Sequence, residues 1–375
     1  MVETKRLGDV ATYINGYAFK PDDWCKEGLP IVRIQDLTGT SYQQNYYKGD
    51  YPAKIEINDG DVLISWSASL GVHIWDRGKA LLNQHIFKVV FDKVEVDKQY
   101  FVYAVQYNLE NMLSKMHGAT MKHIVKKDFD NIEVPFPTLA EQKRVASILT
   151  YAKDAIEDRK QQLTKLDNLV KSRFVEIFGD PQINPFEWDV VNISEVVGGK
   201  VSNGYFAKRD DYVDDGNVSV LGVANVVNRM YSNVDGLPRT NAEAKDIEKF
   251  EVKYGDMLFC RSSLVAEGIG KASIIPENVH ENVVFECHVI RLPLDLSKCV
   301  PEFMQTLSTM DFFRNQVISQ SKTATMTTIG QDGILKTNII LPPLDKQRDF
   351  YAFVKHIDKS KLTLCRYNVM EYKCE

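Results

Sequence analysis

The chain has 375 residues, which at roughly 100–200 residues per domain predicts two or three domains. Hydrophobic residues make up 44% of it and charged residues 26%, and these ordinary values exclude a wholly disordered chain. The formal net charge of −5 excludes a uniformly basic nucleic-acid coat but is compatible with a local basic groove. We expect a cytoplasmic protein with no membrane association, because there is no apolar run of about 18 residues and no signal-peptide core. Its six cysteines form no Cys-x-x-Cys pair, and we expect them to be reduced thiols.

The N-terminal part of the chain has the pattern of a mixed α/β domain. Residues 30–34, 62–65 and 86–91 are β-rich runs bounded by Gly, Asp or Asn, which is typical of short strands. Residues 97–116 carry apolar side chains at helical spacing, so they predict a helix.

A long helix follows, because residues 139–178 contain neither Gly nor Pro. Apolar residues, together with Arg159 and Arg173, step by alternating threes and fours, which is the 3.5-residue repeat of a coiled-coil seam. Gly179 and then Pro181 end the helix, which at about 1.5 Å per residue would be roughly 60 Å long. The apolar residues of this predicted seam are Leu149, Ala152, Ile156, Leu163, Leu166, Val170 and Ile177.

The same order of features then occurs a second time. Ala-Thr-Met stands at 119–121 and again at 324–326. Gly-Asp-x-Leu begins at residues 60 and 255, with Met257 in the variable position of the second copy, and Asn-Gly-Tyr begins at residues 15 and 203. Three matched blocks in one order predict a duplicated domain, and a period near 200 residues excludes a solenoid.

The second copy also predicts strands, a helix and a terminal long helix. The expected strands are 218–224, 257–260 and 283–292, and the expected helix is 301–317. The last helix, 344–375, carries Phe350, Phe353, Ile357 and Leu364 on one face. We expect the two long helices to pair, since a long helix that exposes an apolar face is not stable alone. The alternative is two separate surface helices, one docked on each domain. The predicted division is 1–138, helix 139–180, 181–343 and helix 344–375.

The order of these motifs resembles the specificity subunit of type I restriction–modification systems over essentially the whole chain. The resemblance is carried by residues 118–124 (Gly-Ala-Thr-Met-Lys-His-Ile) and 135–143 (Pro-Phe-Pro-Thr-Leu-Ala-Glu-Gln-Lys) before the long helix. Related segments precede the second long helix at 323–329 and 341–348, although Thr323 replaces Gly118. The junction 178–181 (Phe-Gly-Asp-Pro) also resembles that family's entry into its second recognition domain.

The resemblance implies a DNA-reading subunit that has no catalytic activity of its own. Each α/β target-recognition domain would read one half of a split, asymmetric target in double-stranded DNA. The two helices would pair antiparallel as a coiled coil and hold the half-sites at a fixed separation. Adenine-specific DNA methyltransferase subunits and ATP-driven restriction/translocase subunits would be the partners. S-adenosylmethionine, ATP and Mg would be bound there, with no cofactor in this chain.

Base reading needs amide, hydroxyl, guanidinium or ammonium groups at groove edges, with aromatic rings beside them. The candidates in the first copy are Asn15, Gly16, Tyr17, Lys20, Arg33, Gln35, Ser65, Trp66, Ser67, Thr120, Lys122 and His123. The candidates in the second copy are Asn203, Gly204, Tyr205, Lys208, Arg209, Asn225, Arg261, Ser262, Ser263, Lys322, Thr325, Thr327 and Thr328. The alternative for Asn-Gly is an ordinary turn, and for Trp66 a place in the core.

The sequence carries no positive sign of catalysis. Residues 184–186 (Asn-Pro-Phe) lack the second Pro of an adenine methyltransferase loop, and residues 268–271 lack the leading Gly of a phosphate loop. Cys287 and His288 are adjacent on an expected strand and would point to opposite faces, so we predict no metal site. Two alternatives remain: a degenerate methyltransferase or nuclease whose site is assembled across the copies, and a coiled-coil adaptor that never touches DNA.

Overall fold

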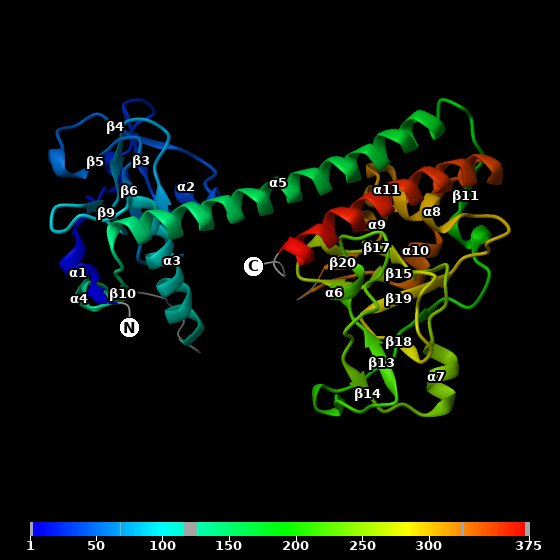
Figure 1. Ribbon diagram of the computed structural model, residues 1–375. Helices are drawn as coiled ribbons and strands as arrows, with labels where there is room; N and C mark the ends of the chain where they lie inside the picture. Colours follow the sequence, from blue (N-terminus) through cyan, green and yellow to red (C-terminus); the bar gives the residue numbers. More distant parts are fainter. Residues whose placement is uncertain (1–2, 68, 116–125, 324–325, 372–375) are drawn as a thin grey trace. The chain divides into compact units, whose positions relative to one another are not determined.

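The structure is a computed structural model that describes residues 3–67, 69–115, 126–323 and 326–371 (Figure 1). The chain divides into two compact units, Met1–Asp158 and Arg159–Glu375, called unit 1 and unit 2 below. The boundary falls inside one continuous helix, α5 (Leu139–Phe178), so each unit contains a part of this helix.

Unit 1 is built on two four-stranded sheets. The first has the order β2-β9-β6-β7 and is antiparallel throughout. The second has the order β4-β3-β8-β5, in which β3 and β8 run parallel. Their bounds are β2 (Thr12–Asn15), β9 (Ile86–Val90), β6 (Val62–Ser65), β7 (Gly71–Ile74), β4 (Asn45–Tyr47), β3 (Leu29–Val32), β8 (Ala80–Leu82) and β5 (Glu56–Ile57). The remaining elements are β1 (Thr4–Arg6) paired with β10 (Glu133–Pro135), α1 (Leu7–Val10), α2 (Ile34–Thr38), α3 (Lys98–Lys115), α4 (Lys126–Asp130), η1 (Pro21–Asp23) and η2 (Ala53–Ile55).

Unit 2 repeats this topology, except that its second sheet has three strands and not four. Its four-stranded sheet has the order β12-β19-β15-β17, and its second sheet, β14-β13-β18, keeps the parallel pair between β13 and β18. The bounds are β12 (Ser202–Asn203), β19 (Val289–Pro293), β15 (Asp256–Cys260), β17 (Ala272–Ile274), β14 (Arg239–Thr240), β13 (Val218–Leu221) and β18 (Val283–Phe285). The pair β11 (Val190–Asn192) and β22 (Asn338–Ile340) matches β1 and β10. Matching topologies confirm the duplication that the repeated motifs predict.

Unit 2 also has a small third sheet of the order β16-β21-β20. It joins β16 (Ser262–Ser263) to β21 (Thr327–Thr328) and β20 (Lys322–Thr323). The other elements of the unit are η3 (Ile193–Val196), η4 (Arg209–Asp211), α6 (Val223–Val226), α7 (Ala244–Phe250), η5 (Ala266–Gly268), α8 (Pro301–Ser308), α9 (Asp311–Ser319), α10 (Gln331–Leu335) and α11 (Leu344–Glu371).

Two expected elements of the second copy are each divided in the structure. The strand expected at 283–292 is two strands, β18 and β19, which belong to different sheets. Cys287 and His288 therefore lie between strands and not on one. The helix expected at 301–317 is divided into α8 and α9 after Ser308, and Met310 caps α9 in an extended conformation. Continuous apolar patterning does not reveal such a break, because both pieces bury apolar side chains.

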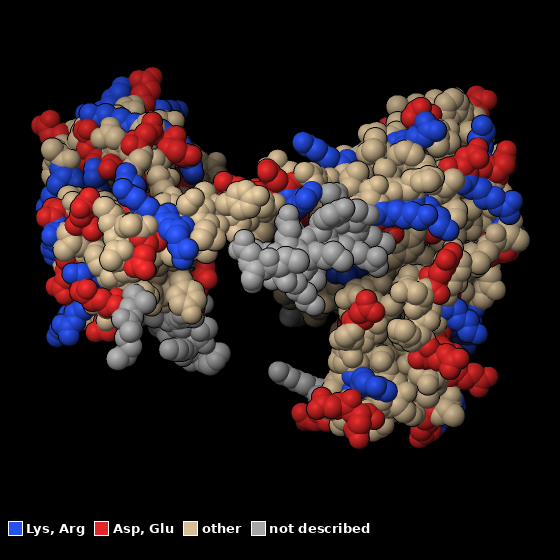
Figure 2. All heavy atoms as spheres, in the orientation of Figure 1, with Lys and Arg blue, Asp and Glu red and all other residues tan. Residues whose placement is uncertain are grey.

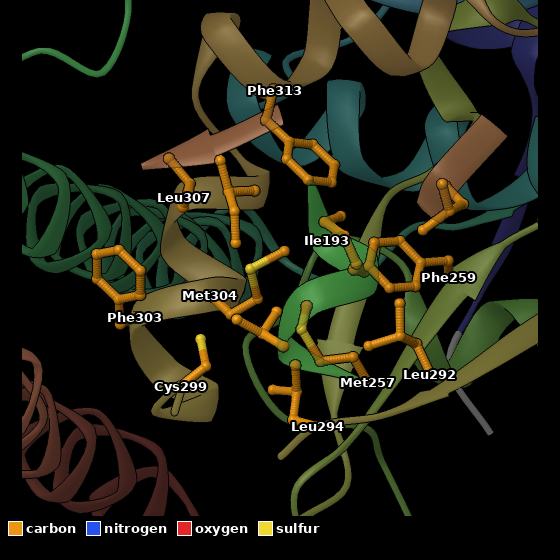
Figure 3. Close-up of a cluster of buried hydrophobic side chains, with 14 of the residues drawn as sticks. Ile193, Met257, Phe259, Leu292, Leu294, Cys299, Phe303, Met304, Leu307 and Phe313 are labelled. Atoms are coloured by element: carbon orange, nitrogen blue, oxygen red, sulfur yellow. The ribbon is translucent and has the colours of Figure 1, made fainter. Parts of the chain in front are cut away.

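The largest apolar core lies in unit 2, between its four-stranded sheet and the helices α8 and α9. Figure 3 shows Met257, Phe259 and Leu292 from the sheet on the same side of α8 as Met304, whereas Phe303 lies on the other side of α8, toward α5. All five side chains are fully buried. This core fixes the sheet against the helices, which determines where the strand ends present their polar residues.

The long helices α5 and α11 contact one another within unit 2 and run antiparallel. The Lys361 Nζ lies 2.5 Å from an Asp167 carboxylate oxygen, whereas the rings of Phe350 and Phe178 lie 5.7 Å apart. From the first contact to the second, the residue number increases along α5 and decreases along α11, so the two helices run in opposite directions. Helix pairing over this segment is therefore observed (Figure 1).

The predicted seam holds only in part of α5. Leu149 and Ile156 are 41% and 53% exposed, and Ala152 is half-buried; their place in a helix pair stays a prediction. In unit 2 the buried or half-buried members of the predicted seam are Leu163, Leu166, Val170, Ile177, Phe350, Phe353 and Ile357. The side chain of Leu364 lies outside the described residues.

Each long helix begins with the same glutamine clamp. Gln142 donates to the carbonyl of Pro137 (2.9 Å) and accepts from the backbone N–H of Asp97 (2.9 Å), just before α3. Gln347 donates to the carbonyl of Pro342 (2.7 Å) and accepts from the N–H of Val300 (2.8 Å), just before α8. Both glutamines are buried. The clamp thus ties the start of each long helix to the start of the helix that packs on its domain.

Within the described residues, no helix combines the length and the apolar content that crossing a bilayer requires.

Candidate nucleic-acid interface

The Asn-Gly-Tyr segments occupy equivalent places in the two units, and neither is a turn. The N–H of Tyr17 donates to the carbonyl of Leu82 (2.8 Å), and that of Tyr205 donates to the carbonyl of Phe285 (2.7 Å). Each tyrosine thereby pairs with the end of the parallel strand of the second sheet. The segments continue β2 and β12 in extended form and join the two sheets of their unit.

The glycines are required by this close approach. A Cβ at Gly16 would lie 2.1 Å from the carbonyl oxygen of Asn83, and one at Gly204 would lie 2.2 Å from those of Glu286 and Phe285. A contact that short with backbone forces the chain to shift. Gly16 and Gly204 therefore have a structural role, and whether they also contact DNA stays a prediction.

The tyrosines and lysines that follow present side chains near the same strand ends. Tyr17 is exposed, whereas Tyr205 is half-buried and its hydroxyl donates to the carbonyl of Asn241 (3.3 Å). Burial raises the pKa of Tyr205, and nearby carboxylates such as Asp246 add to this, so the phenol stays neutral. Lys20 and Lys208 are both exposed.

The same hydrogen bond holds the backbone at these lysines in both units. The N–H of Lys20 donates to Asp23 and that of Lys208 to Asp211, each at 2.7 Å. The two loops thus have the same local geometry, which leaves both ammonium groups in solvent. The side chain of Arg209 lies outside the described residues.

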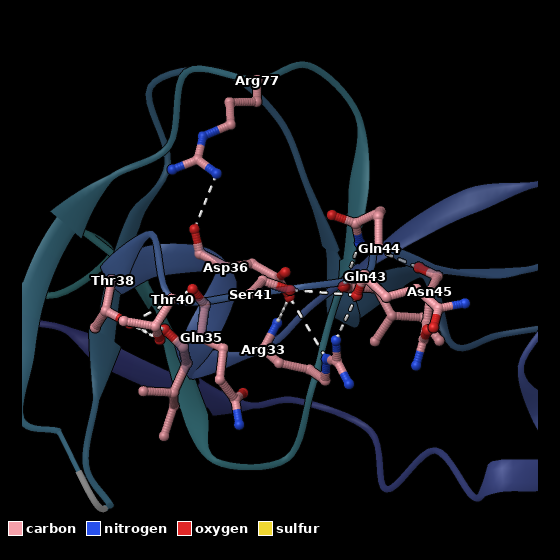
Figure 4. Close-up of polar contacts among 12 residues, drawn as sticks. Arg33, Gln35, Asp36, Thr38, Thr40, Ser41, Gln43, Gln44, Asn45 and Arg77 are labelled. Atoms are coloured by element: carbon pink, nitrogen blue, oxygen red, sulfur yellow. Dashed lines mark hydrogen bonds and ion pairs between the residues drawn. The ribbon is translucent and has the colours of Figure 1, made fainter. Parts of the chain in front are cut away.

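Arg33 and Gln35 lie at the start of α2, where Figure 4 shows the polar contacts. The guanidinium of Arg33 donates to the carbonyl of Gln43 (2.8 Å) and lies 3.6 Å from an Asp36 carboxylate oxygen. It also lies 5.7 Å from the ring of Trp24. Gln35 is exposed. Arg33 is thus largely held by protein, whereas the amide of Gln35 faces solvent.

Asn225 occupies the equivalent of Asp36 in unit 2 and is also a cap. Its side-chain oxygen accepts from the N–H of Gly222 (3.1 Å), as Asp36 accepts from the N–H of Arg33 (2.8 Å). Gly222 stands where unit 1 has Arg33, so the two units present different groups at one structural position.

The candidates at the end of β6 and directly after it are buried or half-buried. Ser65 is fully buried and its hydroxyl donates to the carbonyl of Ser69 (2.6 Å). Trp66 is half-buried and stacks on Phe87 at 5.6 Å, which matches the core alternative. Ser67 beside it is half-buried.

In unit 2 the small sheet brings together candidates that are more than 50 residues apart in sequence. Ser262 lies opposite Thr328, and Thr328 lies opposite Lys322. Directly opposed residues point to the same face of a sheet, so these three side chains form one row, called the recognition row below. Thr328 and Lys322 are exposed, and Ser262 is half-buried.

The other candidates of this region surround the recognition row. Arg261 precedes it and donates to the carbonyl of Cys287 (3.2 Å). Ser263 and Thr327 lie opposite each other on the other face, and Thr327 is buried. The side-chain amide of Asn203 meets that of Gln331 at 3.2 Å. Gln331 is not among the residues predicted from the sequence, because no motif connects it with Asn203.

Four predicted residues, Thr120, Lys122, His123 and Thr325, lie outside the described residues. Leu264 was not predicted, yet it directly follows β16 and is 83% exposed. In the described part of the chain, no three His, Cys, Asp or Glu side chains are grouped in a way that could hold a metal ion. Figure 2 shows acidic and basic side chains interspersed on the surfaces of both units, in keeping with the net charge of −5.

Together these features define a class of protein: a modular recognition protein with two domains of one topology and different polar side chains at matched strand ends. A family model described as the type I restriction modification DNA specificity domain matches residues 1–167 and 185–368. The chain belongs to this family, and its function is that of a type I DNA specificity subunit. The alternative of a degenerate methyltransferase or nuclease is not favoured.

Individual relatives agree over nearly the whole chain. The type I restriction enzyme EcoBI specificity subunit of Escherichia coli is 21% identical, covering 94% of this chain and 78% of the relative. The MjaVIII specificity subunit of Methanocaldococcus jannaschii is 24% identical, covering 95% and 86%. The crystal structure of a type I restriction-modification S subunit from M. genitalium has the same fold, with a TM-score of 0.54 at 13% identity over 99% of this chain and 94% of that one.

Proposed function

We propose that unit 1 and unit 2 each read one half of a bipartite, asymmetric target in double-stranded DNA. The observation that carries this is one topology with different groups at matched positions, where Trp66 corresponds to Arg261 and Arg33 to Gly222. Side chains at groove edges determine which bases are read. Two domains that differ there should read different sequences.

We further propose that this chain has no catalytic activity and acts in the cytoplasm. Adenine-specific DNA methyltransferase subunits would bind S-adenosylmethionine, and restriction/translocase subunits would bind ATP and Mg. A chain of net charge −5 has little general attraction for phosphates. Basic partner subunits would therefore contribute much of the salt-sensitive affinity for DNA.

Exchange of the first domain tests the division of the target. Residues 1–138 are replaced by the corresponding domain of another specificity subunit, and the complex with its methyltransferase selects from random oligonucleotides. We expect only one half of the selected motif to change. Enrichment of no split motif by the parent complex would contradict DNA reading, and methyl transfer by the purified chain alone would contradict the non-catalytic assignment.

The recognition row provides a sharper test in unit 2. Because Thr328 and Lys322 are exposed on one face, Thr328→Ala with Lys322→Gln should alter base preference only in the half-site of unit 2. Thr323→Val is the matched control, since Thr323 lies on the other face of the same strand. If the parent and the double variant select the same motif, the recognition row does not contact the bases.

A further inference from the structure

A cavity of about 360 Å³ lies within unit 2 and has a strongly basic lining. It is bounded by α5, α8, α9, α11, the residues 228–230 that follow α6, and Lys271 with the start of β17. Its charged lining consists of Lys171, Arg229, Lys271, Arg314, Lys361 and Asp167. This is a formal excess of four positive charges around one space, in a chain whose net charge is negative.

The protein itself balances little of this charge. Lys361 is paired with Asp167 at 2.5 Å, which removes one cation and the only carboxylate of the lining. Lys271 donates to the neutral side chain of Asn228 (2.8 Å), and Lys171 has no hydrogen bond or ion pair among the residues that the structure describes. Four cations therefore remain without a charged partner in the described structure.

Arg314 is the most constrained of them. Its Nη2 donates to the carbonyl of Glu267 (2.9 Å), whereas its Nη1 is buried and has no partner in the described structure. Burial lowers the pKa of Arg314, because desolvation disfavours the charged guanidinium. A buried donor without an acceptor is costly, so the site is incomplete until an acceptor occupies it.

We propose that this cavity binds a phosphate group. A tetrahedral oxyanion accepts hydrogen bonds from several directions, which fits cations that come from four separate segments. The cavity volume of about 360 Å³ is within the range of about 300–1,000 Å³ of sites for small organic ligands, so it also has room for groups attached to the phosphate.

The position of the cavity favours a DNA phosphodiester as the source, and this part rests on the proposed function. The carbonyl of Lys271 accepts from the N–H of Cys260 (2.9 Å), next to Arg261. Arg314 holds Glu267 in η5, four residues beyond Ser263. The cavity thus adjoins the segment that leads out of the recognition row, where a backbone phosphate would position the domain. A free phosphate or nucleotide is the other source of the same chemistry.

The test uses Lys171→Gln combined with Arg229→Gln in the full chain with its methyltransferase subunits. Both residues are exposed, so the fold should tolerate the change. If the ligand is DNA, affinity should fall about tenfold or more for every sequence, with the selected motif unchanged. The slope of log affinity against log salt should decrease by about two. Lys165→Gln with Lys346→Gln is the charge-matched control, since both are exposed residues of the long helices outside the cavity.

A second arm uses the full chain alone and inorganic phosphate at constant ionic strength. If DNA binding is unchanged in the variant, but phosphate raises the melting temperature of the parent and control chains and not of the variant, the ligand is a free phosphate compound. If neither DNA affinity nor the response to phosphate depends on Lys171 and Arg229, the proposal is wrong. A parent complex that selects no motif would instead contradict the proposed function, while the phosphate arm would still decide the cavity.

Discussion

Gly16 and Gly204 connect the two sheets of their units by passing directly against neighbouring backbone. Their Asn-Gly dipeptides are common in turns, yet both segments here are extended. The reason is non-local: the following tyrosine N–H pairs with the end of β8 or β18, and this pairing leaves no room for a side chain.

Gly16→Ala and Gly204→Ala should each destabilise their unit by about 1–3 kcal/mol, because the added methyl group would contact backbone that cannot rotate away. Urea unfolding measures the change. Gly330→Ala is the control, since a Cβ there meets nothing within 4 Å and its φ is −91°. Equal effects at all three positions would show that close approach is not the cause.

Glu302 is a buried carboxyl on α8 that should make stability depend on pH. Tyr231 donates to one oxygen at 3.0 Å, and the other oxygen has no partner in the described structure. Desolvation raises the pKa of Glu302 above its ordinary value, and the Tyr231 hydrogen bond offsets this only in part. The folded state then binds the proton more tightly than the unfolded state does.

The contribution of Glu302 to stability should be greatest below the unfolded pKa and should decrease as pH rises toward the folded pKa. Glu302→Gln should flatten this decrease as pH rises above about 4, as followed by the melting temperature. Asp345→Asn, at an exposed site in the first turn of α11, is the control. An unchanged pH profile in Glu302→Gln would contradict the assignment.

Among the elements, the pair α5 and α11 is held by a cluster of aromatic rings. Phe174 and Phe178 are fully buried and lie 5.5 and 5.7 Å from Phe350. Neither Phe174 nor Phe178 lies on the predicted 3.5-residue seam. They are buried because α8 also packs against this part of α5, with Phe303 4.9 Å from Phe178, so the apolar face is wider than a two-helix seam.

Phe350→Ala should cost about 3–5 kcal/mol, because it removes the ring that both α5 phenylalanines contact. Thermal unfolding of the full chain measures the loss. Tyr151→Ala is the matched control on α5, since Tyr151 is 78% exposed. A loss in Phe350→Ala no larger than in this control would mean that the aromatic cluster does not hold the pair. The seam predicts in addition that Leu163→Asp or Leu166→Asp weakens pairing, because a buried unpaired charge is costly.

For the whole molecule, the important feature is that one helix passes through both units. Residues 153–158 of α5 are all exposed and adjoin the unit boundary. Each unit has its own apolar clusters, and the glutamine clamps at Gln142 and Gln347 fix a long helix to each domain. A change in the length of α5 should therefore alter the target without unfolding either unit.

Insertion of seven helix-forming residues after Glu157 adds about 10.5 Å and nearly two full turns. At about 34 Å per 10 base pairs, the spacer between the two half-sites should change by about three base pairs, with both half-sites unchanged. Oligonucleotide selection with the complex measures this. Seven Ala-rich residues added after Gly49, in a loop of unit 1, are the control and should leave the spacer as it is. An unchanged spacer in the α5 insertion would show that the helix does not set the distance.

Local signals in the sequence were enough to predict the duplication, the bounds of α5 and several strands of the larger sheets. Matched motifs show a repeat, absence of Gly and Pro allows a 139–178 helix, and β-rich runs bounded by turn residues mark strands such as 62–65. The sequence alone predicts only in part which candidate side chains lie on the surface, where they could contact DNA. Side-chain type indicates chemistry, but exposure separates Gln35 and Thr328 from the buried Ser65 and Thr327.

Which residues meet in space follows from the packing and pairing of distant segments, and no local sequence pattern predicts it. The recognition row joins Ser262 to Thr328 and Lys322 by strand register, and register is set by pairing between distant segments. The same holds for the division of 283–292 between two sheets and for the burial of Phe174 and Phe178 by α8. The basic cavity is likewise formed by segments that are far apart in sequence. Hydrophobic periodicity predicts individual helices and strands because it depends on residues that are close in sequence. The candidate binding surfaces depend instead on how distant helices and strands pack together.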